Sequence, residues 1–183
     1  MADRSPIGTA PSRDVGWRAA LFVFLLAGIF WLGTSAGRGI IGNHLLRPGT
    51  LQFDEYLAPE AQREIFRLLS LTSLVVMVCY VATLVSSIIF LWLSPLRLKE
   101  HGWLMLSAIL FYLFVPVETY TLFLDGRMIY EEFFATSDNS VFRELFMQRL
   151  TALAGAPMIA TFCYITIIGI VAFQPLRRRA EGS

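Results

Sequence analysis

Glu118 is the one acidic residue inside a long apolar run of this sequence, in the segment FVPVETYTLF. Counted from Trp103 at 1.5 Å per residue, it lies about 22 Å along a helix, in the outer third of a membrane crossing. Ionisable side chains at such a depth are rare and by default indicate ion or proton handling. The alternative is that Glu118 reaches the membrane interface and pairs with Arg38 or Arg127. The sequence leaves both interpretations open, and Pro116 predicts a kink in the helix nearby.

The other candidate residues lie in two similar segments that combine acidic and aromatic residues, FDEYLA at 53–58 and YEEFFA at 130–135. Carboxylate clusters suit Ca²⁺ or Mg²⁺, but the spacing of a known metal-binding loop is missing, so we predict no metal site. Catalysis by Glu55 and Glu132, as in a lipid-modifying enzyme, lacks a recognisable nucleophile and base. We expect instead that Arg63 and Arg143 pair with these two glutamates. The predicted cap and docking residues are Phe53, Asp54, Glu55, Tyr56, Arg63, Glu64, Tyr130, Glu131, Glu132, Phe133, Arg143 and Glu144.

Several other chemistries are excluded by the position of the residues that they need. His44 and His101 fall on opposite sides of the predicted membrane, so they do not jointly bind a haem. Cys79 and Cys163 lie in apolar runs without CxxC spacing, which is typical of small packing residues. The net charge of +1 gives no reason to expect a nucleic-acid partner. We therefore predict no cofactor and no enzymatic activity.

Four apolar segments are long enough to cross a bilayer, since a crossing helix needs about 20 mostly apolar residues. As helices, these segments would position the residues named above. The segments are residues 17–36, 69–93, 103–124 and 150–173. The chain is 56% hydrophobic and 16% charged, whereas soluble domains carry about 25% charged residues. The sequence therefore predicts an all-α membrane protein, a bundle of four transmembrane helices.

The first apolar segment has a second interpretation, as a cleaved signal peptide. Small residues follow its apolar core at Gly33–Ala36, as they do at cleavage sites. The tail that precedes the segment mixes aspartates with arginines, however, and a signal peptide has a purely basic one. This mixture favours a retained membrane anchor.

The orientation follows from the arginines and lysines. The two terminal tails and the loop 94–102 together hold eight of them against four acids, whereas the loops 37–68 and 125–149 hold seven against nine. A basic excess marks the cytoplasmic side. We expect both termini to be cytoplasmic, most simply in a bacterial inner membrane, with both long loops outside. The predicted interface anchors are Trp17, Arg97, Trp103, Arg177, Arg178 and Arg179.

The two halves of the chain share further phrases in the same order. REIF at 63–66 matches RELF at 143–146, and SPLR at 94–97 matches QPLR at 174–177, both with an offset of 80 residues. We predict a tandem duplication of one helical hairpin, so that two parallel repeats are related by a two-fold axis along the membrane normal. The helix from Pro59 to Leu93 should be about 52 Å long and project beyond the lipid, and a helix from Ser140 should repeat it.

These expectations divide the chain and suggest a role. The division is a tail at 1–16, a first repeat at 17–97, a loop at 98–102, a second repeat at 103–177 and a tail at 178–183. Small size, an outer cap and aromatic-rich spans favour an accessory or assembly subunit of a larger membrane complex. Its partners would be the lipid bilayer and either other membrane proteins or further copies of the chain. The alternative is a small transporter or channel that uses Glu118.

Overall fold

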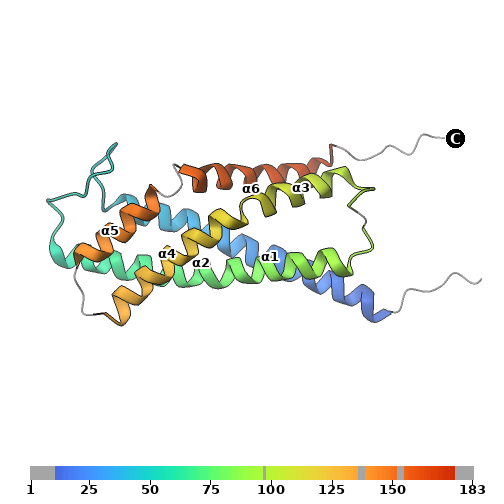
Figure 1. Cartoon of the computed structure of the whole chain (residues 1–183), viewed down its shortest axis with the longest axis horizontal. Coiled ribbons are helices and arrows are strands. Elements are labelled where there is room, and N and C mark those ends of the chain that lie inside the picture. The colour runs from blue at the N-terminus through green and yellow to red at the C-terminus, as the bar shows by residue number, and fades with distance from the viewer. Residues whose placement is uncertain (1–10, 97, 136–138, 152–154, 176–183) are drawn as a thin grey trace, which may run out of the picture.

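The computed structural model describes residues 11–96, 98–135, 139–151 and 155–175 and is all-helical (Figure 1). Helices make up 82% of the described residues, and within these ranges there is no strand, only an isolated bridge between Leu46 and Phe53. The helices are α1 (Pro11–Asn43), α2 (Pro59–Leu93), α3 (Gly102–Leu113), α4 (Val115–Phe133), α5 (Asn139–Leu150) and α6 (Ala156–Phe173).

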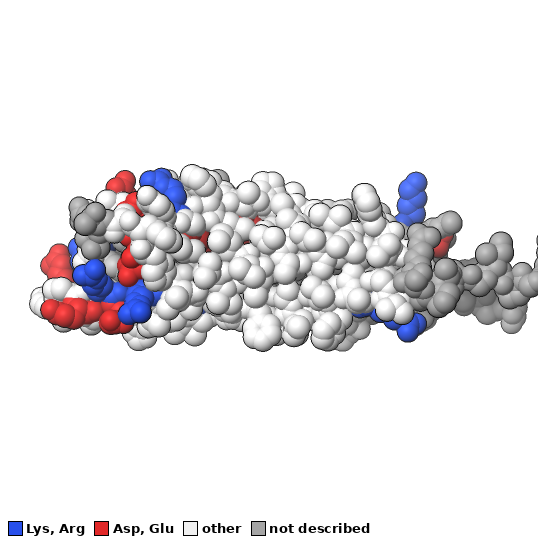
Figure 2. All heavy atoms as spheres, turned by 90° about the horizontal axis from the view of Figure 1, so that it is seen from below, with Lys and Arg blue, Asp and Glu red and all other residues white. Residues whose placement is uncertain are grey.

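Four helical stretches are long and apolar enough to cross a membrane, as the sequence predicted. They are Val15–Asn43, Pro59–Leu93, Gly102–Phe133 and Ala156–Phe173. Figure 2 shows charged side chains gathered toward the two ends of the molecule, with a wide apolar band between them on the face in view. This is the distribution expected when hydrocarbon surrounds the middle of a bundle.

Helix α2 has the bounds that the sequence predicted. Pro59 occupies the first helical turn, where its missing N–H costs nothing. The helix ends at Ser94, whose backbone is extended, directly before Pro95. The 35 residues of α2 exceed a membrane crossing, so its first turns extend past the hydrocarbon.

The helices α1 and α4 continue further than predicted, into segments that the sequence indicated as loops. α1 runs to Asn43 and α4 runs to Phe133. The repeated phrases therefore adopt different conformations, because Tyr130–Phe133 is helical whereas the segment 53–58 is not. The polar residues of 125–133 resemble a loop in composition, but they belong to a helix that packs on its neighbours.

A break in the third crossing confirms the kink expected near Pro116. The helix is interrupted at Phe114, whose φ of −95° and ψ of 0° separate α3 from α4. Pro116 lies in the first turn of α4, where the proline ring prevents a continuous hydrogen-bond ladder.

The fourth crossing does not repeat the second. The duplication predicts helices of equal length, but α5 has 12 residues and α6 has 18, with an interruption between Leu150 and Ala156. Gly155 has a φ of +87°, a left-handed conformation that favours glycine and ends helical continuity. The continuous helix expected from Ser140 is therefore a wrong prediction.

The helices associate as two pairs, α1 with α2 and α3 with α6, and α4 crosses between them (Figure 1). A cluster of aromatics fills the middle, where the Trp31 ring lies 5.0 Å from that of Tyr80 and 4.8 Å from that of Tyr164. Toward the end where α1 begins and α6 ends, an apolar cavity of about 300 Å³ lies between the two pairs.

A compact cap forms at the opposite end of the bundle. It consists of the loop 44–58, the first turns of α2, the last turns of α4, and α5. Its core is contiguous and buried, and Phe66 of α2 stacks on Phe142 of α5 with ring centroids 4.2 Å apart. The Cβ of an alanine at Gly42 would lie 3.0 Å from the Phe146 ring, so α1 and α5 approach closely here. The buried core makes the cap a folded part of the bundle.

Candidate functional site

Three charged side chains form a buried ion network between α1, α4 and α5. Asp125 is 1% exposed and Arg38 is 5% exposed. Arg38 Nη1 donates to Asp125 Oδ2 over 2.8 Å, and Arg149 Nε donates to Asp125 Oδ1 over 2.5 Å. Each carboxylate oxygen accepts a charge-assisted hydrogen bond, which offsets much of the cost of burying the carboxylate.

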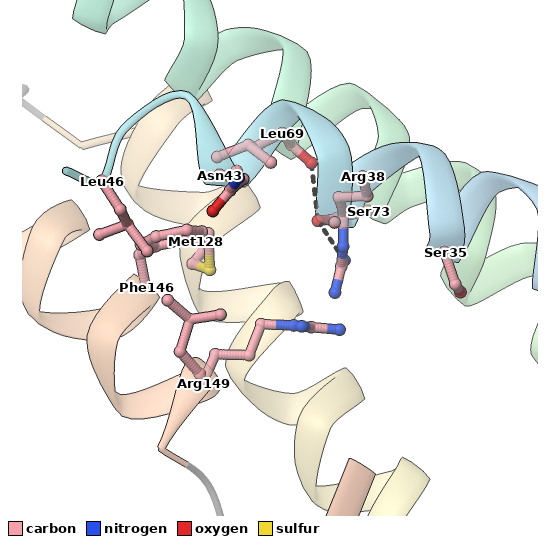
Figure 3. Close-up of a pocket in the computed structure, with 12 residues that line it drawn as sticks. Ser35, Arg38, Asn43, Leu46, Leu69, Ser73, Met128, Phe146 and Arg149 are labelled. Carbon is pink, nitrogen blue, oxygen red and sulfur yellow. Dashed lines mark hydrogen bonds between the residues drawn. The ribbon is translucent and has the colours of Figure 1, made fainter. Parts of the chain in front are cut away.

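Ser73 connects α2 to the same network. Arg38 Nη1 donates to Ser73 Oγ over 2.7 Å, and Ser73 Oγ donates to the carbonyl oxygen of Leu69 over 2.7 Å (Figure 3). Ser73 is fully buried. We call Arg38, Ser73, Asp125 and Arg149 the arginine–aspartate network, and it joins four of the six helices.

A count of residues along three helices puts the network at the end of a membrane crossing. A crossing takes about 20 residues. Counting that length from Trp17 along α1, from Leu93 back along α2 and from Trp103 along α3 and α4 leads to about residues 37, 73 and 123. These positions adjoin Arg38, Ser73 and Asp125. Three helices thus bring their polar side chains to one depth, on the cap side of the apolar band.

A cavity of about 130 Å³ borders the network between α1 and α5. Figure 3 shows the guanidinium groups of Arg38 and Arg149 directed into the same space. Arg38 Nη2 is buried and has no hydrogen-bond partner among the residues that the structure describes. The wall on the α1 side includes Gly39 and Gly42, and Asn43 adds a polar amide. The cavity therefore has a donor-rich wall and room for a group larger than water.

Glu118 lies next to the network but outside it. The Tyr164 hydroxyl on α6, Asp125 and Arg38 are close enough to influence the charge of its carboxyl. Arg38 makes its ion pair with Asp125, and Arg127 is exposed. Among the described residues, neither of the two arginines considered for Glu118 forms an ion pair with it.

The cap residues are organised differently from the predicted ion pairs. Glu55 pairs with Arg47 over 3.3 Å, not with Arg63. Arg143 donates to Gln62 Oε1 over 2.7 Å instead of pairing with Glu132, and its guanidinium lies 5.2 Å from the centre of the Phe53 ring. Glu55 thus pairs within its own loop, whereas Arg143 contacts Gln62 and Phe53 of the other half of the chain.

The remaining cap residues lie on or near the surface. Asp54 accepts a hydrogen bond from the backbone N–H of Tyr56 over 3.0 Å, which stabilises the loop turn. The positive charges of Arg63 and Arg67 on α2 attract the carboxylate of Glu132. Glu64, Glu144, Tyr130 and Phe133 are exposed, and Glu131 is half-buried.

The predicted anchors that the structure describes lie at the end opposite the cap. Trp17 packs near Phe90 with ring centroids 6.4 Å apart, and Trp103 stacks on His101 at 6.4 Å. Both tryptophans are half-buried, as suits amphipathic rings at a headgroup boundary. The other predicted anchors, Arg97 and Arg177–Arg179, lie outside the described residues.

Sequence reasoning missed Asp125 and Arg149 as site residues. Both fell in a segment indicated as a loop, in which charged residues are ordinary. The signal that could have found them is the distance of Asp125 from Trp103, which is about one crossing length. Compared with models of protein families, with curated proteins and with solved structures, the chain matches none.

Proposed function

We propose that the protein is a non-enzymatic accessory or assembly subunit of a larger membrane complex. The cap would lie on the extracytoplasmic face of a bacterial inner membrane, with both termini in the cytoplasm. The excess of arginine and lysine in the tails and in the loop 94–102 supports this orientation. The lipid bilayer is one partner, and a second membrane protein or another copy of the chain is the other.

The observation that carries this proposal is an exposed stripe along α4. Phe123, Arg127 and Tyr130 of α4 follow one another at intervals of four and three residues, which places them on one helical face. Phe134 comes directly after the last residue of the helix. Phe123 is 61% exposed, Tyr130 is 60% exposed and Phe134 is 76% exposed. We call these four residues the α4 stripe.

The α4 stripe has the composition of a protein interface. Aromatic residues and arginine are enriched at interface centres, where they supply most of the binding energy. The ring of Tyr130 stacks near that of Phe134 with centroids 6.0 Å apart, and a shallow hollow at Gly126 lies between Phe123 and Tyr130. The stripe runs from the apolar band into the cap. It therefore suits an apolar partner helix that presents an acidic side chain to Arg127.

The test is extraction of the complex in native-lipid nanodiscs, with its mass measured before and after substitution. The double variant Tyr130→Ser/Phe134→Ser should lose the partner and appear at the mass of a single chain. Its melting temperature should stay unchanged, because both side chains are exposed in the isolated chain.

The matched control is Tyr56→Ser, which removes an even more exposed cap aromatic that lies outside the stripe. This variant should keep the partner. A wild-type protein that leaves the membrane as a single chain would contradict the proposal. Loss of the partner with Tyr56→Ser alone would show that the interface lies elsewhere on the cap.

A second candidate function is a small transporter or channel that uses Glu118. The observation in its favour is the carboxyl beside Tyr164 within the bundle, since buried ionisable groups often line ion pathways. Reconstituted protein should then carry a proton or cation flux that falls at least about tenfold with Glu118→Gln. A flux that is unchanged by this substitution would remove the support.

We also propose that the chain arose by duplication of a helical hairpin, giving two parallel repeats. The repeated phrases and their shared offset support this origin. The interruption between α5 and α6 weighs against it, because the corresponding α2 is continuous.

A further inference from the structure

The cavity beside the arginine–aspartate network has more hydrogen-bond donors than acceptors. Each guanidinium carries several N–H donors and no acceptor. Arg38 uses Nη1 for Ser73 and Asp125, and its buried Nη2 has no partner within the described part of the chain. Arg149 bonds Asp125 through Nε. A buried donor without a partner costs free energy, so this arrangement favours an acceptor in the cavity.

The charges that face the cavity leave one guanidinium without a counter-charge. Arg38 of α1 and Arg149 of α5 line the cavity, whereas α2 contributes only the neutral Ser73 and Leu69. Asp125 of α4 pairs with both arginines from outside the lining, so two guanidinium groups share one carboxylate. Glu118 interacts electrostatically with Arg38 but does not line the cavity. The bound group should therefore be anionic and should accept bonds from two guanidinium groups, as a phosphate does.

The size and depth of the cavity indicate where the phosphate comes from. Its volume of about 130 Å³ is roughly ten times what a single water requires. Arg38 and Ser73 lie at the headgroup level, by the count of about 20 residues per crossing. Phospholipid phosphates occupy the same depth. An Nη2 donor at this level can therefore meet a lipid phosphate without any aqueous entry path.

We propose that the cavity between α1 and α5 binds the phosphate of a phospholipid in the leaflet on the cap side. Arg38 and Arg149 hold the phosphate oxygens, and Asn43 is available to the rest of the headgroup. Gly39 and Gly42 have no side chains, so they leave space on the α1 side of the cavity, and a Cβ built at Gly39 meets no atom within 4 Å. This lipid site is independent of the partner interface proposed above, because it contains no residue of the α4 stripe.

The test is thermal unfolding of the full-length protein, delipidated in detergent, with three added probes. Short-chain phosphatidylglycerol should raise the melting temperature by about 5 °C at a hundredfold excess over its dissociation constant. Diacylglycerol with the same chains should not, because it lacks the phosphate. An equal shift with inorganic phosphate alone would overturn the assignment to a lipid.

The decisive variant is Gly39→Leu, which fills the cavity and leaves both arginines in place. It should abolish the shift caused by phosphatidylglycerol. Gly37→Leu is the matched control, since a Cβ there also meets open space but lies outside the cavity lining. Its shift should equal that of the wild type.

Arg149→Gln provides a second measurement that does not depend on how Gly39→Leu packs. The half-buried Arg149 loses its charge in this variant, and native mass spectrometry should show at least about tenfold less retained phosphatidylglycerol. Undiminished lipid retention in Arg149→Gln, or an undiminished shift in Gly39→Leu, would overturn the proposal.

Discussion

Asp125 is the residue on which the buried charges of this molecule depend. It accepts bonds from Arg38 of α1 and Arg149 of α5, so it balances two guanidinium groups that would otherwise repel each other. Removing one partner of a buried ion pair is costly because the other charge stays unpaired in a medium of low dielectric constant. The carboxylate therefore determines whether α1 and α5 can pack together against α4.

Substitution of Asp125 by asparagine should destabilise the protein strongly. The change keeps the volume but leaves both arginines without their counter-charge, at a cost of about 3–5 kcal/mol. The melting temperature in detergent should fall by about 10 °C or more. Glu144→Gln, an exposed change on α5, is the control and should leave it unaffected.

A double variant checks that the loss arises from the network. Adding Arg149→Gln to Asp125→Asn removes one of the two arginine charges that the first substitution leaves unpaired. The additional loss of stability should therefore be smaller than the loss caused by Arg149→Gln alone. Simple additivity of the two losses would show that the residues act independently and would contradict the network.

At the scale of the elements, the interruption between α5 and α6 distinguishes the two halves of the chain. Gly155 adopts a φ of +87° at the start of α6. A left-handed conformation is costly for any residue with a Cβ. The interruption lets α5 turn into the cap, where Phe142 and Phe146 complete the core.

Gly155→Ala should therefore destabilise the protein by about 1–2 kcal/mol. Gly169→Ala is the matched control, since Gly169 lies within helix α6 and its Cβ would meet no atom within 4 Å. It should be neutral or slightly stabilising, by up to about 1 kcal/mol. Denaturant titrations of both variants in one detergent give the comparison, and equal stabilities would argue for a continuous fourth helix.

The elements that the sequence predicted well are those with local start and stop signals. Pro59 and the Ser94–Pro95 pair define α2 to the residue. The ends of α1 and α4 were not predicted, because Arg38 and Asp125 are charged residues of the kind that is common in loops. Their mutual neutralisation joins positions 87 residues apart in the sequence. Pairing between distant helices is a tertiary property, and residue type alone does not reveal it. Glu118 could be singled out from the sequence because its contrast with the surrounding apolar run is local, and its role stays a prediction.

At the scale of the whole molecule, the excess of arginine and lysine predicts both termini on the cytoplasmic side. A reporter that is active only outside the cytoplasmic membrane should be silent when fused after Ser183. The same reporter should be active when inserted near Asn139, between α4 and α5. An insertion at Lys99, in the loop between α2 and α3, is the control and should be silent. The reverse pattern would contradict the orientation.

The ion pair between Arg38 and Asp125 also constrains the order in which the chain is assembled during synthesis. The ribosome delivers Arg38 first and adds Asp125 87 residues later, which takes about 4–17 s at 5–20 residues per second. During that interval the arginine has no counter-charge at its final depth. Ser73 arrives 35 residues after Arg38 and can hold its guanidinium in the meantime. Until the second half of the chain is made, the hairpin of α1 and α2 therefore holds Arg38 with Ser73 as its polar partner and without Asp125 as its counter-charge.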